Sequence, residues 1–123
     1  MKIVLLDGYE LNKDLNWKSL QELGDCTLYD RTPVNDNAEI IKRIKDADIV
    51  ITHKTPLDHE VISKISRLKY IGIMGTGYDV VDIESAHQNK VVVTNIPTYA
   101  SDAVAQFTFS LLLEVTRVRL KTT

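Results

Sequence analysis

Two closely spaced glycines, Gly75 and Gly77, are the residues of this 123-residue sequence whose types and spacing could most directly do chemistry. Because neither carries a Cβ atom, such a turn can present backbone N–H groups to an anion as a small nest. A dinucleotide-binding fingerprint would also need a glycine in place of Val80 and an acidic residue in place of Asn95. The spacing therefore leaves two interpretations, an ordinary turn or an anion-binding nest around Thr76.

The three histidines and the single cysteine form no recognisable catalytic or metal-binding set. His53 ends an apolar run beside Lys54, so it could face a ligand. His59 and His87 are predicted to lie exposed on helices. No histidine pair has the spacing with a carboxylate that a metal site needs, and no serine or cysteine stands in a nucleophile motif. Cys26 is predicted to be a buried core thiol without a disulfide partner.

Short apolar runs alternate regularly with amphipathic helical segments along the chain. The runs predict strands at 2–6, 26–29, 49–51, 68–74 and 91–94, and the segments between them predict helices at 15–23, 38–44, 58–65 and 83–86. This order predicts an α/β fold, with a five-stranded and mostly parallel sheet and helices on both of its faces. Ligands bind such sheets beyond the carboxyl ends of the strands, where His53 and Gly75 both fall.

The helix boundaries and faces follow from single residue types. Gly24 is well placed as the C-terminal cap of the first helix, and Asp58 as the N-terminal cap of the third. In the second helix, Ala38, Ile41 and Ile44 form an apolar stripe at helical spacing. The charged residues between them are predicted to form a solvated face.

Composition bounds the class of protein. A formal net charge of −2, with 44% hydrophobic and 26% charged residues, is ordinary for one globular domain and excludes a disordered chain. A charge this close to balance argues against a nucleic-acid partner. No segment is long and apolar enough to span a membrane, and the N-terminal apolar run is too short for a signal peptide. A soluble, cytoplasmic protein is the resulting expectation.

The last segment, 101–119, differs from the helices before it. Apolar residues at helical spacing continue around more than one side, as Phe107, Leu111 and Val115 do on one side and Phe109 and Leu113 on another. A helix that is apolar nearly all round is normally buried on all sides. One small domain can cover only part of this surface, so a second partner is expected to cover the rest.

One long stretch is distinctive as a whole: IMGTGYDVVDIESAHQNKVVVTNIPTYASDAVAQFTFSLLLEV. Its glycine turn is followed by Tyr78 with Asp79, Val81 with Asp82, Ala86, the corner Asn95-x-Pro97, and Val104-Ala105-Gln106. In this order and spacing, these residues resemble the D-isomer-specific 2-hydroxyacid dehydrogenases, in particular the glycerate dehydrogenase (hydroxypyruvate reductase) branch. The resemblance extends back toward Met1 and covers essentially the whole chain.

The resemblance implies a domain organisation. In that family a flavodoxin-like domain holds the substrate, and a Rossmann domain inserted after it binds NAD and carries the catalytic arginine and glutamate. By this resemblance 1–100 is the flavodoxin-like substrate-binding domain and 101–119 is a C-terminal apolar connecting helix, with the Rossmann domain absent. The implied partners are a small 2-hydroxy or 2-keto acid and a second copy of the chain, paired through 101–119. The 123 residues alone are expected to be inactive.

The resemblance also implies roles for individual residues at the substrate edge. Thr76 and Gly77 match the loop whose backbone amides hold the substrate carboxylate, and Gly75 begins that loop. Lys54 matches a position near the substrate, and Tyr99 matches a hinge position that can face it. This carboxylate-binding role agrees with the anion nest that the glycine spacing allows.

Two further positions concern the cofactor and a departure from the family. Val104 matches a residue that packs beside the nicotinamide of NAD, and Thr76 matches one that can also touch the cofactor. Phe107 stands where many relatives carry a histidine that is not the catalytic one. The family's catalytic arginine, glutamate and histidine have no counterpart in these residues, so no catalytic residue is expected in this chain.

A stand-alone flavodoxin-like small-molecule-binding module or receiver domain is the alternative of a different class. A receiver carries an acidic pair after its first strand and an aspartate after its third. Here Asp7 stands alone after the first strand, and the third ends in Thr52, His53 and Lys54. A flavodoxin would need a hydroxyl- and glycine-rich phosphate loop after its first strand. The acidic residues found there disfavour it, and the site favours the dehydrogenase interpretation.

Overall fold

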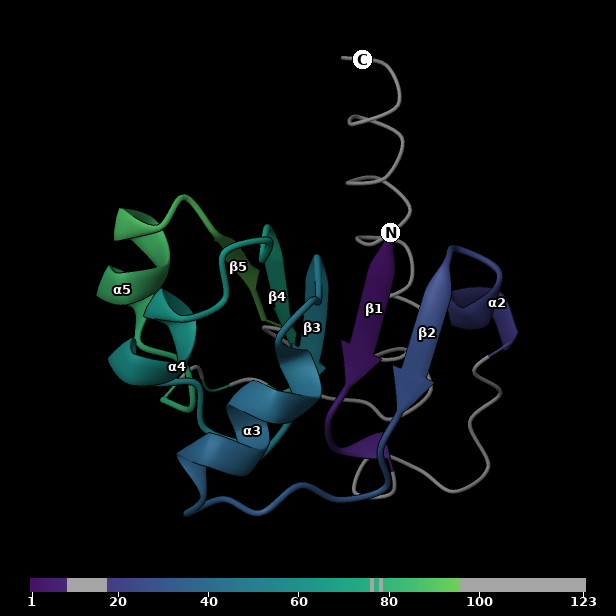
Figure 1. Cartoon of the computed structure of the whole chain (residues 1–123), viewed down its shortest axis with the longest axis horizontal. Coiled ribbons are helices and arrows are strands. Elements are labelled where there is room, and N and C mark those ends of the chain that lie inside the picture. Colours follow the sequence, from purple (N-terminus) through teal and green to yellow (C-terminus); the bar gives the residue numbers. More distant parts are fainter. Residues whose placement is uncertain (9–17, 76, 78, 96–123) are drawn as a thin grey trace.

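A computed structural model of the chain describes residues 1–8, 18–75, 77 and 79–95 (Figure 1). Its strands are β1 (Lys2–Leu5), β2 (Asp25–Leu28), β3 (Ile49–Thr52), β4 (Tyr70–Ile73) and β5 (Val92–Thr94). Its helices are α2 (Lys18–Gln21), α3 (Asn37–Ile44), α4 (His59–Ser63) and α5 (Ile83–Gln88). The predicted alternation of strands and helices is confirmed over this part of the chain.

The strands form one parallel sheet in the order β2-β1-β3-β4-β5. β1 is paired on both sides, so that Ile3 lies opposite Cys26 of β2 and Ile49 of β3. The chain first builds outward from β1 to β2 and then returns to continue from β3 on the other side. This reversal places the carboxyl ends of β1 and β3 next to each other, which is where sheets of this kind bind ligands.

Helices pack on both faces of the sheet (Figure 1). On one face, alternate strand residues such as Val4, Val50 and Ile71 share a buried cluster with side chains of α3, α4 and α5. On the other face, Ile3, Ile49 and Tyr70 cluster with Leu20 of α2. Successive residues of a strand point to opposite faces, so a sheet covered on both faces needs continuously apolar strands. This explains the apolar runs of the sequence.

Aspartates start three of the described helices. The side chains of Asp36, Asp58 and Asp82 accept hydrogen bonds from the backbone N–H groups three residues on, at 3.1, 3.0 and 3.1 Å. Each bond satisfies an N–H group that has no partner within the helix. The predicted cap at Asp58 is confirmed.

Two helix details differ from the prediction. In α3 the buried residues are Ile40 and Ile44, while Ala38 is exposed. Gly24 follows α2 but does not have the left-handed backbone of a glycine cap, since no described glycine has a positive φ. A Cβ atom at Gly24 would instead lie 2.4 Å from the carbonyl oxygen of Met1, so close approach of the N-terminal backbone explains this glycine.

Candidate functional site

The carboxyl ends of β1, β3 and β4 bring together three segments that are far apart in the sequence. Asp7 follows β1, the loop 53–55 follows β3, and Gly75 follows β4. In the register of the sheet, Leu5 lies opposite Ile51, and Thr52 lies opposite Ile73. Each segment therefore begins within two residues of the same edge.

The carboxylate of Asp7 is the centre of this edge, although Asp7 is only 2% exposed. Its Oδ2 accepts hydrogen bonds from the backbone N–H groups of His53, Lys54 and Thr55, at 2.9, 2.9 and 3.0 Å. Its Oδ1 accepts a 2.7 Å hydrogen bond from the hydroxyl of Thr55. The Thr52 hydroxyl lies 3.1 Å from Oδ2 and 2.8 Å from the Thr55 carbonyl oxygen, and its single proton serves one acceptor at a time. The loop 53–55 is thus wrapped around one carboxylate.

Two opposed effects set the pKa of Asp7. Burial raises the pKa, because it disfavours the charged form. Hydrogen bonds from the N–H groups of His53, Thr55 and Lys54 and from the Thr55 hydroxyl lower it, and the net result is a pKa below the ordinary value. Asp7 is therefore ionised at neutral pH. Because its carboxylate occupies the N–H groups of the loop 53–55, those groups are not available to a substrate anion.

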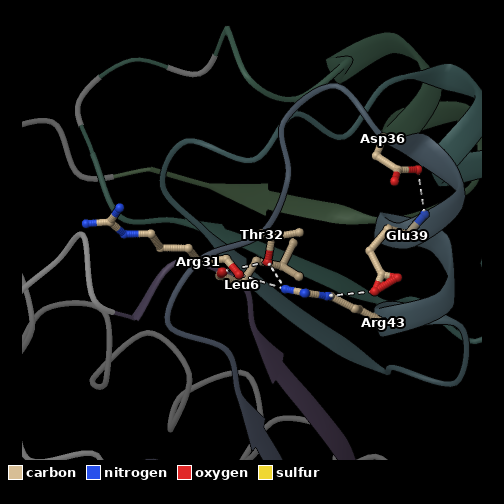
Figure 2. Close-up of polar contacts among 6 residues, drawn as sticks. All are labelled: Leu6, Arg31, Thr32, Asp36, Glu39 and Arg43. Carbon is tan, nitrogen blue, oxygen red and sulfur yellow. Dashed lines mark hydrogen bonds and ion pairs between the residues drawn. The ribbon is translucent and has the colours of Figure 1, made fainter.

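The residue before Asp7, Leu6, is anchored by the connection between β2 and α3 (Figure 2). The hydroxyl of Thr32 donates a 2.7 Å hydrogen bond to the carbonyl oxygen of Leu6, the residue directly before Asp7. Arg43 of α3 donates to the Arg31 carbonyl oxygen at 2.7 Å and to the Thr32 hydroxyl at 2.9 Å. The connection from β2 to α3 therefore holds the chain on one side of Asp7, and the loop 53–55 holds it on the other.

The turn at Gly75 and Gly77 carries backbone N–H groups that could donate hydrogen bonds to a ligand. Within the described residues, the backbone N–H groups of these two glycines make no hydrogen bond. Gly75 is buried, and a Cβ atom there would lie 3.4 Å from Cδ2 and 3.7 Å from Nε2 of the His53 ring. Gly77 is exposed, and a Cβ atom there would meet no described atom within 4 Å. Neither glycine has a positive φ, so space around the turn, rather than a left-handed backbone, distinguishes them.

His53 lies between Asp7 and this turn. Its backbone N–H is bound by Asp7, and its ring edge faces Gly75. The Nδ1 atom of the ring is buried and has no hydrogen-bond partner among the described residues. Of the other two histidines, His59 is exposed, as predicted, with its Nδ1 2.9 Å from the Ser85 hydroxyl, and His87 is exposed on α5.

The predicted site residues that the structure describes follow two neighbouring strands. Lys54 is exposed on the loop after β3, and Gly75 and Gly77 follow β4, which pairs with β3. The remaining predicted site residues lie outside the described residues, as does the helix expected at 101–119: Thr76, Tyr99 and Val104. The sequence presents Asp7 as a lone acidic residue where a receiver carries a pair, and the signal for its observed role is the pair of threonines, Thr52 and Thr55, around a strand end.

Other chemistry is limited in the described part of the chain. No group of three histidine, cysteine or acidic side chains there could hold a metal ion, and no helix there is long and apolar enough to cross a membrane. Cys26 is half-buried rather than fully buried. Burial, together with the nearby charge of Asp25, raises the pKa of its thiol to about 11, so this thiol is unreactive at neutral pH.

Comparison with known proteins identifies relatives along the whole chain. A hydroxypyruvate reductase of Blautia hydrogenotrophica is 52% identical over 116 residues, which are 94% of this chain and 36% of that protein. The structure of an acyclic imino acid reductase in complex with NADPH and D-Arg superposes with a TM-score of 0.70 at 36% identity, over 99% of this chain and 39% of that one. The structure of NAD⁺-bound 3-phosphoglycerate dehydrogenase of Entamoeba histolytica superposes with a TM-score of 0.68 at 32% identity. The match covers 77% of this chain and 32% of that one.

The chain thus spans between 32% and 39% of the length of these relatives. The family model described as the D-isomer specific 2-hydroxyacid dehydrogenase catalytic domain matches residues 3–121. This match overturns the alternative of an unrelated receiver or flavodoxin. The chain belongs to the D-isomer-specific 2-hydroxyacid dehydrogenase family.

Proposed function

We propose that this chain is the substrate-binding part of an NAD-dependent oxidoreductase that interconverts a D-2-hydroxy acid and its 2-keto acid. The observation that carries the proposal is the turn at Gly75 and Gly77, whose N–H groups have no partner in the described structure. These groups would bind the substrate carboxylate, because oriented backbone N–H groups form an anion site. A glycerate-like acid is the proposed substrate, supported by the 52% identity to a hydroxypyruvate reductase.

Lys54 is proposed to add positive charge beside the bound carboxylate, since it is exposed on the neighbouring loop. The loop itself contributes no N–H group to the anion, because Asp7 already binds those of 53–55. By the family resemblance, Thr76 completes the turn, Tyr99 faces the substrate, and Val104 packs beside the nicotinamide. The compartment proposed is the cytoplasm, which agrees with a free thiol at Cys26.

The glycine turn of this sequence does not match the dinucleotide-binding fingerprint. Val80 and Asn95 stand where the fingerprint needs a glycine and an acidic residue. We therefore assign the binding of NAD, and the hydride transfer that NAD supplies, to a separate domain of the whole enzyme. Relatives bound to NADPH and NAD⁺ support a nicotinamide cofactor.

The 123-residue polypeptide is expected to bind hydroxypyruvate without converting it. Titration followed by amide NMR should shift the resonances of Gly75 and Gly77 saturably, because their N–H groups would donate to the carboxylate. Assays with NADH and hydroxypyruvate should show no turnover above background, because hydride transfer needs a positioned cofactor. Acetamide, which has no carboxylate, is the control ligand. Turnover by the purified polypeptide would contradict the assignment of NAD binding and hydride transfer to a separate domain. Unmoved glycine resonances would contradict the proposed substrate site.

The polypeptide is also expected to associate as a homodimer through 101–119. Burying one leucine or phenylalanine side chain stabilises by about 1.5–3 kcal/mol, so a few such residues can drive association. Light scattering at micromolar concentration should give twice the monomer mass of 13.9 kDa. The double variant Phe109→Glu with Leu113→Glu should be monomeric, whereas Lys18→Glu, an exposed residue of α2, should stay dimeric. A monomeric wild-type chain would show that this segment does not pair copies.

A further inference from the structure

The donors around Asp7 all come from the end of β3 and the loop 53–55 that follows it, which are remote from Asp7 in sequence. The separation between Asp7 and the residues that bind it is 45–48 positions. Three successive backbone N–H groups converge on Oδ2, and a hydroxyl binds Oδ1. The conformation of the backbone from His53 to Thr55 is therefore set by the position and charge of this carboxylate.

His53 connects that loop with the glycine turn. Its backbone N–H is fixed by Asp7 at 2.9 Å, and its ring packs against Gly75 at ordinary van der Waals distance from where a Cβ atom would be. Because Nδ1 of the ring has no hydrogen-bond partner among the described residues, that atom does not hold the ring in place. The ring is oriented by the loop backbone on one side and by the turn on the other.

We propose that Asp7 is a positioning residue for substrate binding, which acts through the loop 53–55 and the His53 ring on the turn at Gly75 and Gly77. The inference rests on the proposed function, because it assumes that this turn binds the substrate carboxylate. The N–H groups of the loop 53–55 also offset part of the negative charge of Asp7, because they donate to its carboxylate.

The test compares variants of the full 123-residue chain by amide NMR, with hydroxypyruvate as the probe. Asp7→Asn removes the charge, and Thr55→Val removes only the hydroxyl that donates to Oδ1. His53→Ala removes the ring that contacts Gly75. Ile44→Ala is the matched control, since Ile44 is buried in the core at the end of α3 and not at this edge. All are measured at a temperature where each variant is folded.

In Asp7→Asn and Thr55→Val, the Gly75 and Gly77 resonances should move even without ligand. The dissociation constant for hydroxypyruvate should rise about tenfold in Asp7→Asn, equivalent to roughly 1.4 kcal/mol, and by a smaller factor in Thr55→Val. In the His53→Ala background, adding Thr55→Val should no longer move the glycine resonances. Ile44→Ala should lower stability without changing either measurement, which separates positioning from a merely structural role.

Each outcome bears on one of the two proposals. If Thr55→Val and Asp7→Asn leave the glycine resonances where the control has them, the positioning role is wrong, whether or not the ligand binds. If wild type shows no binding while the variants still move these resonances, the coupling stands and the proposed substrate site fails. Should Asp7→Asn not fold, Thr55→Val decides, because this change preserves the shape of the side chain.

Discussion

Asp7→Asn is expected to lower the free energy of unfolding by about 1–3 kcal/mol at neutral pH, because it replaces hydrogen bonds to a charged acceptor with weaker bonds to a neutral one. An amide has the shape of the carboxylate but is uncharged and offers one acceptor oxygen, so an NH₂ group would replace the oxygen that faces the Thr55 hydroxyl. The three N–H groups of 53–55 would keep only a neutral acceptor, and the Thr55 hydroxyl would lose the oxygen to which it donates. Urea unfolding followed by circular dichroism measures the loss.

The matched control for this change is Asp36→Asn. Asp36 is exposed and caps α3, and asparagine caps helices about as well as aspartate. This variant should lose no more than a few tenths of a kcal/mol. If Asp7→Asn lowered the free energy of unfolding as little as Asp36→Asn does, the Asp7 carboxylate would not be what holds the loop 53–55 in place.

The lowered pKa of Asp7 also predicts how the free energy of unfolding changes at acid pH. The pKa of Asp7 in the folded chain is below its ordinary value of 3.8, because hydrogen bonds outweigh burial. Its contribution is therefore fully present above the unfolded pKa and is lost as the pH falls through the folded pKa. The difference in stability between wild type and Asp7→Asn should therefore shrink as the pH falls from 3.8 through the folded pKa. A difference that is independent of pH would mean that the charge of Asp7 does not matter.

Gly77→Val is expected to weaken the binding of hydroxypyruvate by at least about tenfold, or roughly 1.4 kcal/mol, with little change in stability. A Cβ atom at Gly77 meets no described atom within 4 Å, so the new side chain has room in the fold. Under the proposed function, however, this open space is where the carboxylate approaches the N–H groups. The branched side chain would block that approach.

Gly77→Ala should give a smaller loss than Gly77→Val, because a methyl group covers less of the turn. Titration calorimetry with hydroxypyruvate measures the affinities, and urea unfolding shows that both variants remain folded. In an enzyme of full family length, the same change should lower kcat/KM. Unchanged affinity in a folded Gly77→Val variant would remove the turn from the substrate site.

Much of the fold is predictable from the sequence, because the strands are buried on both faces and are apolar without interruption. The runs at 49–51 and 68–74 show this clearly, although the strand formed by the second run, β4, is shorter than predicted and covers Tyr70–Ile73. Neighbouring apolar residues were harder to assign. Ile40 and Ile41 are both compatible with helical spacing, and only the packing of α3 against the sheet shows that Ile40 is the buried one.

The candidate site is predictable only in part, for a similar physical reason. The glycine turn is visible as local spacing, and Lys54 follows a strand that ends at the same edge. The role of Asp7 depends on partners more than 40 residues away, so no local pattern shows it. Close approach likewise explains Gly24, whose neighbour is the backbone of Met1.

A crystal structure of the chain with bound hydroxypyruvate tests the central claim most directly. The account expects the substrate carboxylate at the turn, with its oxygen atoms about 2.7–3.2 Å from the backbone nitrogen atoms of Gly75 and Gly77. The loop 53–55 should still be bound to Asp7 in that complex. A carboxylate seated elsewhere, with the N–H groups of both glycines facing water, would contradict it.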